Sequence, residues 1–88
     1  MLVFKKSTRS DKKYMVTYNN KIIHFGNPYY EHYRDSTGVG AYSHMDHMDE
    51  RRKKSYLKRA KGITDNDGNL TYNDKSSANY YAINYLWK

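Results

Sequence analysis

Cysteine is absent from this 88-residue sequence, which excludes disulfide bonds and metal sites built on thiolates. The lack of cysteine is consistent with an intracellular origin. Long apolar runs are also absent, since no segment approaches the roughly 20 apolar residues of a membrane-spanning helix. The apolar start, Met1–Phe4, is much shorter than the core of a signal peptide. We therefore expect no membrane span and no secretion by a standard signal.

The motifs of nucleophilic and phosphate chemistry are missing as well. The sequence contains no Gly-x-Ser-x-Gly nucleophile elbow and no glycine-rich loop that could cradle a phosphate. His44 or His47, close in sequence to Asp46 and Asp49, could activate water in a metal-dependent nuclease. This constellation is unspecific, so we predict no catalytic residue and no enzymatic activity.

Two segments contain metal-binding residue types without a complete ligand set. His44 and His47 have the i, i+3 spacing that places two side chains on one helix face, but zinc sites need a second pair of ligands. Asp65–Gly68 is similar to part of a calcium loop, yet Ile63 stands where the first carboxylate is needed. An ordinary Asp-Gly turn explains this segment. We predict no bound metal and no cofactor.

Positive charge and tyrosine are what the sequence has in excess. It contains 16 Lys and Arg against 9 Asp and Glu, for a net charge of +7. Such a charge suits nucleic acid, an anionic membrane surface or an acidic protein face, or serves solubility alone. The chain contains 11 Tyr against 2 Phe and 1 Trp. A small, tyrosine-rich core suits one domain, residues 1–88, that completes its burial against a partner.

The first half of the sequence predicts antiparallel strands. Lys13–Tyr18 and Lys21–Phe25 flank Asn19-Asn20, a dipeptide that tolerates the positive φ of a type I′ turn. A third strand is expected at Leu2–Lys5, and Gly26–Pro28 ends the hairpin because proline cannot donate to a ladder. The predicted register pairs Tyr18 with Lys21, Val16 with Ile23 and Tyr14 with Phe25. It places the most apolar residues on one face: Tyr14, Val16, Tyr18, Ile23 and Phe25.

The second half begins with a cationic helix, predicted over Asp46–Lys61 with Asp46 or Ser43 as its cap. Within His47–Gly62 there are seven cations and two acids. Helical spacing predicts a cationic stripe for binding nucleic acid or an acidic partner, formed by Arg51, Lys54, Lys58 and Lys61. The opposite face is expected to seat on the hairpin, and its residues are Lys53, Tyr56, Leu57 and Ala60.

A second helix is predicted over Ala78–Trp87, capped by Ser76 or Ser77. It is hydrophobic nearly all round, so we expect it to be buried within the domain or against a partner. The residues predicted to pack on a partner are Tyr80, Tyr81, Ile83, Leu86 and Trp87. The predicted fold class is α+β, with an N-terminal antiparallel hairpin or three-stranded sheet packed on two C-terminal helices.

Several motifs follow one another along Lys13–Trp87. The hairpin ends in His24-Phe25-Gly26, and the segment that opens the cationic helix reads His47-x-Asp49-Glu50-Arg51-Arg52-Lys53-Lys54-x-Tyr56-x-x-Arg59. The chain then closes on an aromatic segment that ends in Leu86-Trp87. Together these motifs resemble a family of small uncharacterised basic proteins encoded by nucleocytoplasmic large DNA viruses.

The resemblance implies a viral setting and no established reaction. Many members carry Arg-His late in the helix where this chain has Arg59-Ala60, so a histidine-based activity is not expected there. The main hypothesis is a virion component, a minor capsid or cement protein that is synthesised in the host cytoplasm and assembles with other virion proteins. The alternative is a sequence-independent nucleic-acid-binding or genome-packaging protein, which contacts DNA through the basic helix at residues 47–61.

Overall fold

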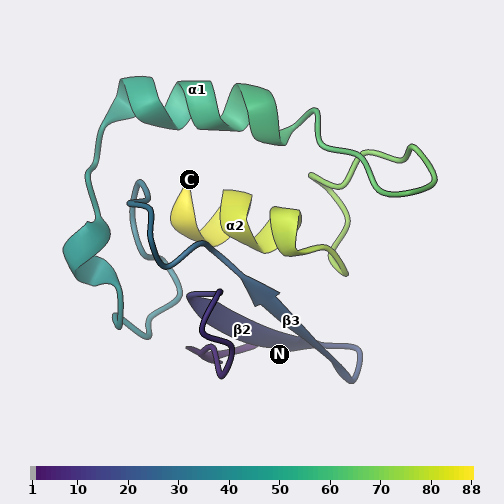
Figure 1. Ribbon diagram of the computed structural model, residues 1–88, viewed down its shortest axis with the longest axis horizontal. Coiled ribbons are helices and arrows are strands. Elements are labelled where there is room, and N and C mark those ends of the chain that lie inside the picture. The colour runs from purple at the N-terminus through teal and green to yellow at the C-terminus, as the bar shows by residue number, and fades with distance from the viewer. Residues whose placement is uncertain (1) are drawn as a thin grey trace.

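The computed structural model describes residues 2–88 and has three layers (Figure 1). A three-stranded antiparallel sheet forms the first layer, α2 lies against it, and α1 lies on the far side of α2. The α+β class and the order of sheet before helices are as predicted. The elements are β1 (Val3–Lys6), β2 (Tyr14–Tyr18), β3 (Lys21–Phe25), the 3-10 helix η1 (Ser43–Met45), α1 (Glu50–Ala60) and α2 (Ala78–Leu86).

The hairpin of β2 and β3 has the predicted register, with Val16 opposite Ile23. Asn19 and Asn20 adopt φ values of 49° and 62°, as a type I′ turn requires, so the turn and the alternation of apolar residues specify the same pairing. The third strand is confirmed at Val3–Lys6, where it pairs with β2 at the sheet edge.

The hydrophobic core lies between the sheet and α2. Strand residues from the predicted apolar face meet the inner face of the helix, and the buried cluster comprises Tyr14, Val16, Ile23, Phe25, Tyr81, Ala82 and Leu86. Tyr18, the fifth residue of that face, is half-buried. Because α2 occupies this face, α1 contacts α2 and no strand. The prediction that α1 seats on the hairpin is therefore wrong: the more apolar helix displaces the cationic one from the sheet.

The helix α1 begins later than predicted. Its N-cap is Asp49, whose carboxylate accepts hydrogen bonds from the backbone N–H groups of Arg51 and Arg52. Ser43 instead starts η1, and the carboxylate of Asp46 bonds to other residues, so neither predicted cap is used. Asp49 is favoured because it directly precedes the helical stretch and places its negative charge at the positive end of the helix dipole.

The helix α2 is satisfied at both ends. Its N-cap is Ser77, one of the two predicted residues, and the Ser77 hydroxyl accepts from the N–H of Asn79. At the other end, the backbone N–H groups of Arg34 and Ser36 donate to the carbonyls of Leu86 and Tyr85 at 2.9 and 2.8 Å. The loop after β3 therefore caps the C-terminus of α2, and this contact ties the loop to the core.

α1 contacts both α2 and the residue that follows it, Trp87. The side-chain amide of Asn79 donates to the carbonyl of Ala60 at 2.8 Å, and Ala60 is the one α1 residue that is fully buried. Farther along the seam, the rings of Tyr56 and Trp87 stack with centroids 4.1 Å apart and planes 9° apart. None of the helices in residues 2–88 has the length and apolar character needed to cross a membrane.

Candidate functional site

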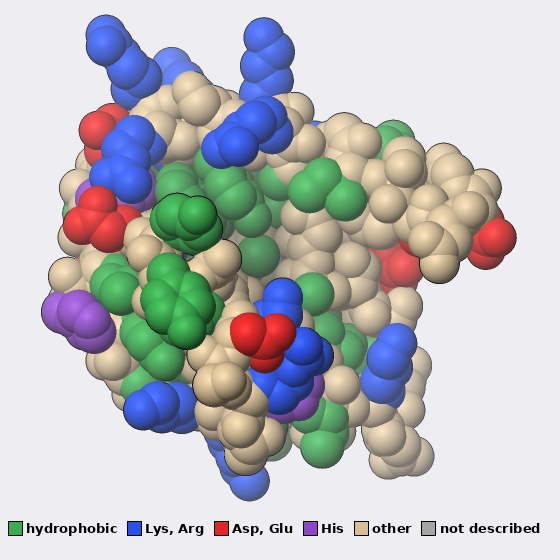
Figure 2. Space-filling model, in the orientation of Figure 1, with side chains coloured by type: hydrophobic (Ala, Val, Ile, Leu, Met, Phe, Trp, Pro, Cys, Tyr) green, Lys and Arg blue, Asp and Glu red, His purple; other side chains and the backbone are tan. Residues whose placement is uncertain are grey.

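A groove runs beneath α1 and has a cavity volume of about 690 Å³. Its walls come from four parts of the chain that are distant in sequence: Lys13 before β2, the start of the loop after β3, one face of α1, and the end of α2 with Trp87. In the space-filling view, Lys and Arg side chains project above this hollow, and hydrophobic side chains line its interior (Figure 2). The groove therefore combines positive charge with apolar surface.

The charged wall belongs to α1. Arg51, Arg52 and Arg59 all line the groove, together with the hydroxyl-bearing Ser55. Glu31 is the one acidic residue in the lining, and its carboxylate lies 3.0 Å from the guanidinium of Arg52. This hydrogen bond lowers the pKa of Glu31 below its usual range. Within the part of the chain that the structure describes, Arg51 and Arg59 have no acidic partner within 4.0 Å, so the wall carries an excess of positive charge.

The aromatic wall is formed by the stacked pair of Tyr56 and Trp87, with Tyr30 at the rim. The pair is half-buried, whereas 69% of Tyr30 is exposed. Burial raises the pKa of Tyr56, so its hydroxyl stays protonated at neutral pH. His47 packs against the indole of Trp87 with a centroid distance of 5.1 Å. Tyr56 lies on the same face of α1 as Arg52 and Arg59, so the groove carries aromatic rings beside its arginines.

Of the four residues in the predicted cationic stripe, only Arg51 lines the groove. The other three, Lys54, Lys58 and Lys61, are exposed outside its lining. Arg52 and Arg59 also line the groove and were not among the predicted site residues. Their spacing with Ser55 and Tyr56 places all four on one helix face, but this face mixes charge with an aromatic ring and fits neither a purely cationic nor a purely apolar stripe.

The residues predicted to pack on a partner are divided by the structure. Tyr81, Ile83 and Leu86 are buried within the domain, so assigning them to a partner surface was wrong. Tyr81 and Leu86 belong to the core cluster formed with the strand residues, so the sheet buries them without a second protein. Tyr80 and Trp87 are half-buried; Trp87 lines the groove, and Tyr80 lines a smaller hollow of about 310 Å³ beside Tyr18.

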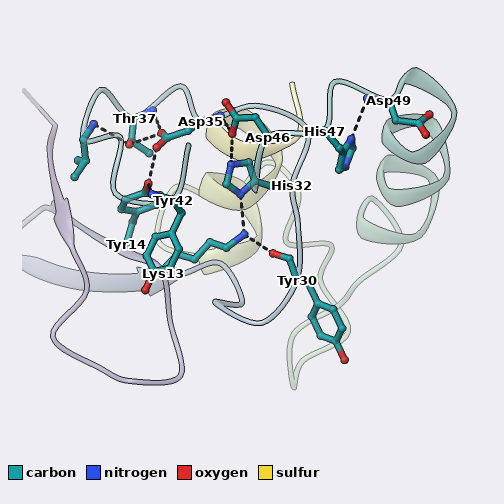
Figure 3. A network of polar contacts seen from close by, with 11 residues as sticks. Lys13, Tyr14, Tyr30, His32, Asp35, Thr37, Tyr42, Asp46, His47 and Asp49 are labelled. Carbon is teal, nitrogen blue, oxygen red and sulfur yellow. Dashed lines mark hydrogen bonds and ion pairs between the residues drawn. The ribbon is translucent and has the colours of Figure 1, made fainter. Parts of the chain in front are cut away.

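A buried polar chain lies next to the groove (Figure 3). The amine of Lys13 donates to the carbonyl of Tyr30 at 2.6 Å and to Nδ1 of His32 at 2.7 Å. Nε2 of His32 then donates to the carboxylate of Asp46 at 2.5 Å. Lys13 and His32 are each 1% exposed, and Lys13 also contributes to the groove lining. These hydrogen bonds hold the loop after β3 against the start of β2.

Burial sets the protonation of Lys13 and His32 in this hydrogen-bond network. Burial lowers the pKa of Lys13 to about 8, although the carboxylates of Asp46, Asp35 and Glu31 act in the opposite direction. Burial also lowers the pKa of His32, and the charge of Lys13 adds to this effect. At neutral pH, His32 is therefore neutral, and Lys13 loses its proton more easily than a surface lysine. No feature of the sequence pattern singled out Lys13 as buried.

A second set of polar contacts anchors the same loop farther along. The hydroxyl of Tyr14 donates to the carboxylate of Asp35 and accepts from the backbone N–H of Tyr42 at 2.8 Å. Burial and the bond to Asp35 raise the pKa of Tyr14 well above its usual range. Asp35 also accepts from the hydroxyl and N–H of Thr37. These contacts fix a long loop that has little regular secondary structure.

Residues considered above as possible metal ligands form local hydrogen bonds in the structure. Nδ1 of His47 accepts from the N–H of Asp49, which orders the start of α1. Asp65 accepts from the N–H groups of Asp67 and Asn69, as an aspartate in a tight turn does. Among residues 2–88, no three His, Asp or Glu side chains gather in a way that could hold a metal ion.

Residues 2–37 match the model of a family of unknown function (DUF5754). This segment spans the whole sheet and includes Lys13 and His32, and it ends before α1 begins. No curated protein and no solved structure matches the chain. The chain is therefore similar to an uncharacterised family over its sheet, while the arginine wall of the groove lies outside the matched residues.

Proposed function

We propose that this protein binds the phosphate backbone of nucleic acid through α1 without reading sequence. The observation that carries the proposal is the convergence of Arg51, Arg52 and Arg59 on one groove, of which only Arg52 has an acidic partner among residues 2–88. A guanidinium offers a planar fork of donors that matches the geometry of phosphate oxygens. Three such groups on one helix, all lining the same groove, form an anion-binding surface.

The surroundings of the groove favour a polyanion over a single small anion. Lys54, Lys58 and Lys61 extend the positive surface along the exposed side of α1. The whole chain has a net charge of +7, so its long-range field also attracts anionic polymers. Binding to several consecutive phosphates releases condensed counterions, which supplies most of the free energy of nonspecific association.

Base-specific recognition is not part of the proposal. The sequence of α1 contains neither Asn nor Gln, the residues that form paired hydrogen bonds with adenine. Contacts from Lys and Arg to phosphate fix position without selecting a sequence. We therefore expect similar affinities for unrelated sequences of equal length.

The test is a salt titration of binding to a labelled oligonucleotide, followed by fluorescence anisotropy. The variant Arg51→Ala/Arg52→Ala/Arg59→Ala should bind at least about 10-fold more weakly, and the slope of log K against log salt should fall by about 0.9 for each lost contact to duplex phosphate. The matched control removes the same charge elsewhere, at three exposed lysines on the sheet and before α2: Lys5, Lys21 and Lys75. If both variants lose the same affinity, binding depends on net charge alone and a site at α1 is refuted.

A role as a minor capsid or cement protein is the second candidate, and an uncovered sheet face favours it. On the side opposite α2, the cross-strand row of Val3, Thr17 and Ile22 is exposed, with Val3 at 49% and Ile22 at 57%. Such a face can pack on another protein. This candidate also rests on the resemblance to proteins of large DNA viruses. Purified particles should then contain the protein, and Ile22→Lys should release it from the shell while leaving oligonucleotide binding unchanged.

A further inference from the structure

We infer that the groove beneath α1 seats an unpaired nucleotide, so that the protein prefers single-stranded nucleic acid to duplex. The inference rests on the proposed function and specifies its substrate class. It is based on one observation: the same cavity is lined by arginines of α1 and by aromatic rings.

The size of the groove fits this occupant. At about 690 Å³, the cavity lies within the range of about 300–1,000 Å³ that holds small ligands. An unpaired nucleotide can insert its base into such a space. A duplex keeps its bases stacked inside and offers the groove only phosphates, so it can engage the arginines at the rim without using the rings.

Tyr30 is the ring best placed to receive a base. It lines the groove, is 69% exposed, and forms no aromatic pair within the described residues. Its backbone is held in place, because the buried amine of Lys13 bonds to the Tyr30 carbonyl at 2.6 Å. A fixed backbone lowers the entropic cost of ordering the ring when it stacks on a base.

The stacked pair of Tyr56 and Trp87 provides the second flat surface. Their parallel rings, 9° apart, form a wall that is already ordered before any ligand binds. Glu31, the one acid of the lining, is neutralised by Arg52 and does not repel a phosphate as a free carboxylate would. An acidic peptide would satisfy the arginines, but its acidic side chains carry no aromatic ring to stack on these rings, so the groove favours a nucleotide.

The inference can be tested with the natural fluorescence of Trp87, the only tryptophan in the chain, which lines the groove. A ten-nucleotide oligo(dT) should quench this fluorescence and should bind about 10-fold more tightly than an abasic oligonucleotide of equal length or a duplex at the same salt concentration. Tyr30→Ala should remove most of this preference. The matched control is Tyr29→Ala, which removes a neighbouring ring that is 80% exposed and lies outside the groove lining.

The outcomes separate the inference from the proposed function. If the abasic strand or the duplex binds as tightly as oligo(dT), or if Tyr29→Ala and Tyr30→Ala behave alike, the nucleotide seat is refuted and phosphate binding by α1 stands. If no oligonucleotide binds at low salt, both are refuted. If poly-glutamate binds more tightly than oligo(dT) and leaves Trp87 unquenched, the groove is a site for acidic protein segments, which also overturns both.

Discussion

The two helices of this protein differ sharply in burial and charge. In α2, four of nine residues are buried, namely Tyr81, Ala82, Ile83 and Leu86, and no residue is charged. In α1, one of 11 residues is buried, and six are Lys or Arg. Because α2 lies between the sheet and α1, it supplies the core, whereas α1 needs to satisfy only one narrow contact and can devote the rest of its surface to charge.

This contrast explains how so basic a segment remains a helix. Six cations repel one another, and α1 buries little apolar surface that could offset this repulsion. Its stability rests on the Asp49 cap, the Tyr56–Trp87 stack and the bond from Asn79 to its last turn. We therefore expect α1 to respond locally to change, and α2 to respond together with the whole domain.

The largest effect is expected from Leu86→Ala in α2. Leu86 is 1% exposed in the core, so the substitution should lower the free energy of unfolding by about 2–5 kcal/mol through lost burial and the cavity left behind. Urea denaturation followed by circular dichroism measures this change. The matched substitution in α1 is Leu57→Ala, which truncates a half-buried residue and should cost less than half as much. Equal costs would contradict the division between the helices.

Gly26→Ala should have the next largest effect, because it combines backbone strain with a clash against α2. Gly26 has a φ of +83°, and a Cβ there would lie 3.0 Å from Leu86 Cδ1 and 3.1 Å from Lys13 Cβ. We expect a loss of about 2–4 kcal/mol from these two terms. Gly68 has the same φ with open space around it. Gly68→Ala should therefore cost only the strain, about 1–2 kcal/mol.

The pH dependence of stability should distinguish the buried Lys13 from the exposed lysines on α1. Lys13 has a pKa of about 8 in the folded protein against an ordinary value of 10.5, so between these values the unfolded chain binds more protons. The free energy of unfolding should therefore rise between pH 8 and 10, by about 1–3 kcal/mol. Above pH 10 the raised pKa of Tyr14 acts in the opposite direction.

The control for this titration is a pair of substitutions with equal chemistry. Lys13→Met should abolish the rise between pH 8 and 10 whatever its effect on absolute stability, whereas Lys54→Met on the exposed side of α1 should retain it. Thermal denaturation at a series of pH values measures the slope. The same slope in both variants would assign the rise to another group.

The smallest effects should come from the two N-caps, and they should differ in kind. Ser77→Ala removes the cap of the buried helix and should lower global stability by about 1 kcal/mol. Asp49→Ala should instead raise hydrogen exchange at the first turns of α1 by about fivefold without changing exchange in α2. Hydrogen exchange monitored by NMR resolves the two cases. Faster exchange throughout the domain in Asp49→Ala would mean that the two helices unfold as one unit.

Features that depend on a few neighbouring residues could be predicted from the sequence. The Asn19-Asn20 turn and the alternation around it identified the hairpin register, and the start of α2 was predicted to within one residue, since Ser76 and Ser77 were the two candidate caps. In the candidate site, the same reasoning located a cationic helix and included Arg51. It missed Arg52 and Arg59, since a helix face that mixes Arg with Tyr56 becomes meaningful only when the opposite wall of the groove is known.

The sequence by itself determined the strands, the turn, the helices and the excess of positive charge, because these follow from local backbone preferences and side-chain periodicity. The tertiary structure alone decided the order of the layers, since two helices compete for one sheet face and the more apolar α2 gains more by covering it. That order moved α1 outward and opened the groove beneath it. The tertiary structure also buried Lys13 beside His32, a contact that the sequence does not reveal because the two residues are 19 positions apart.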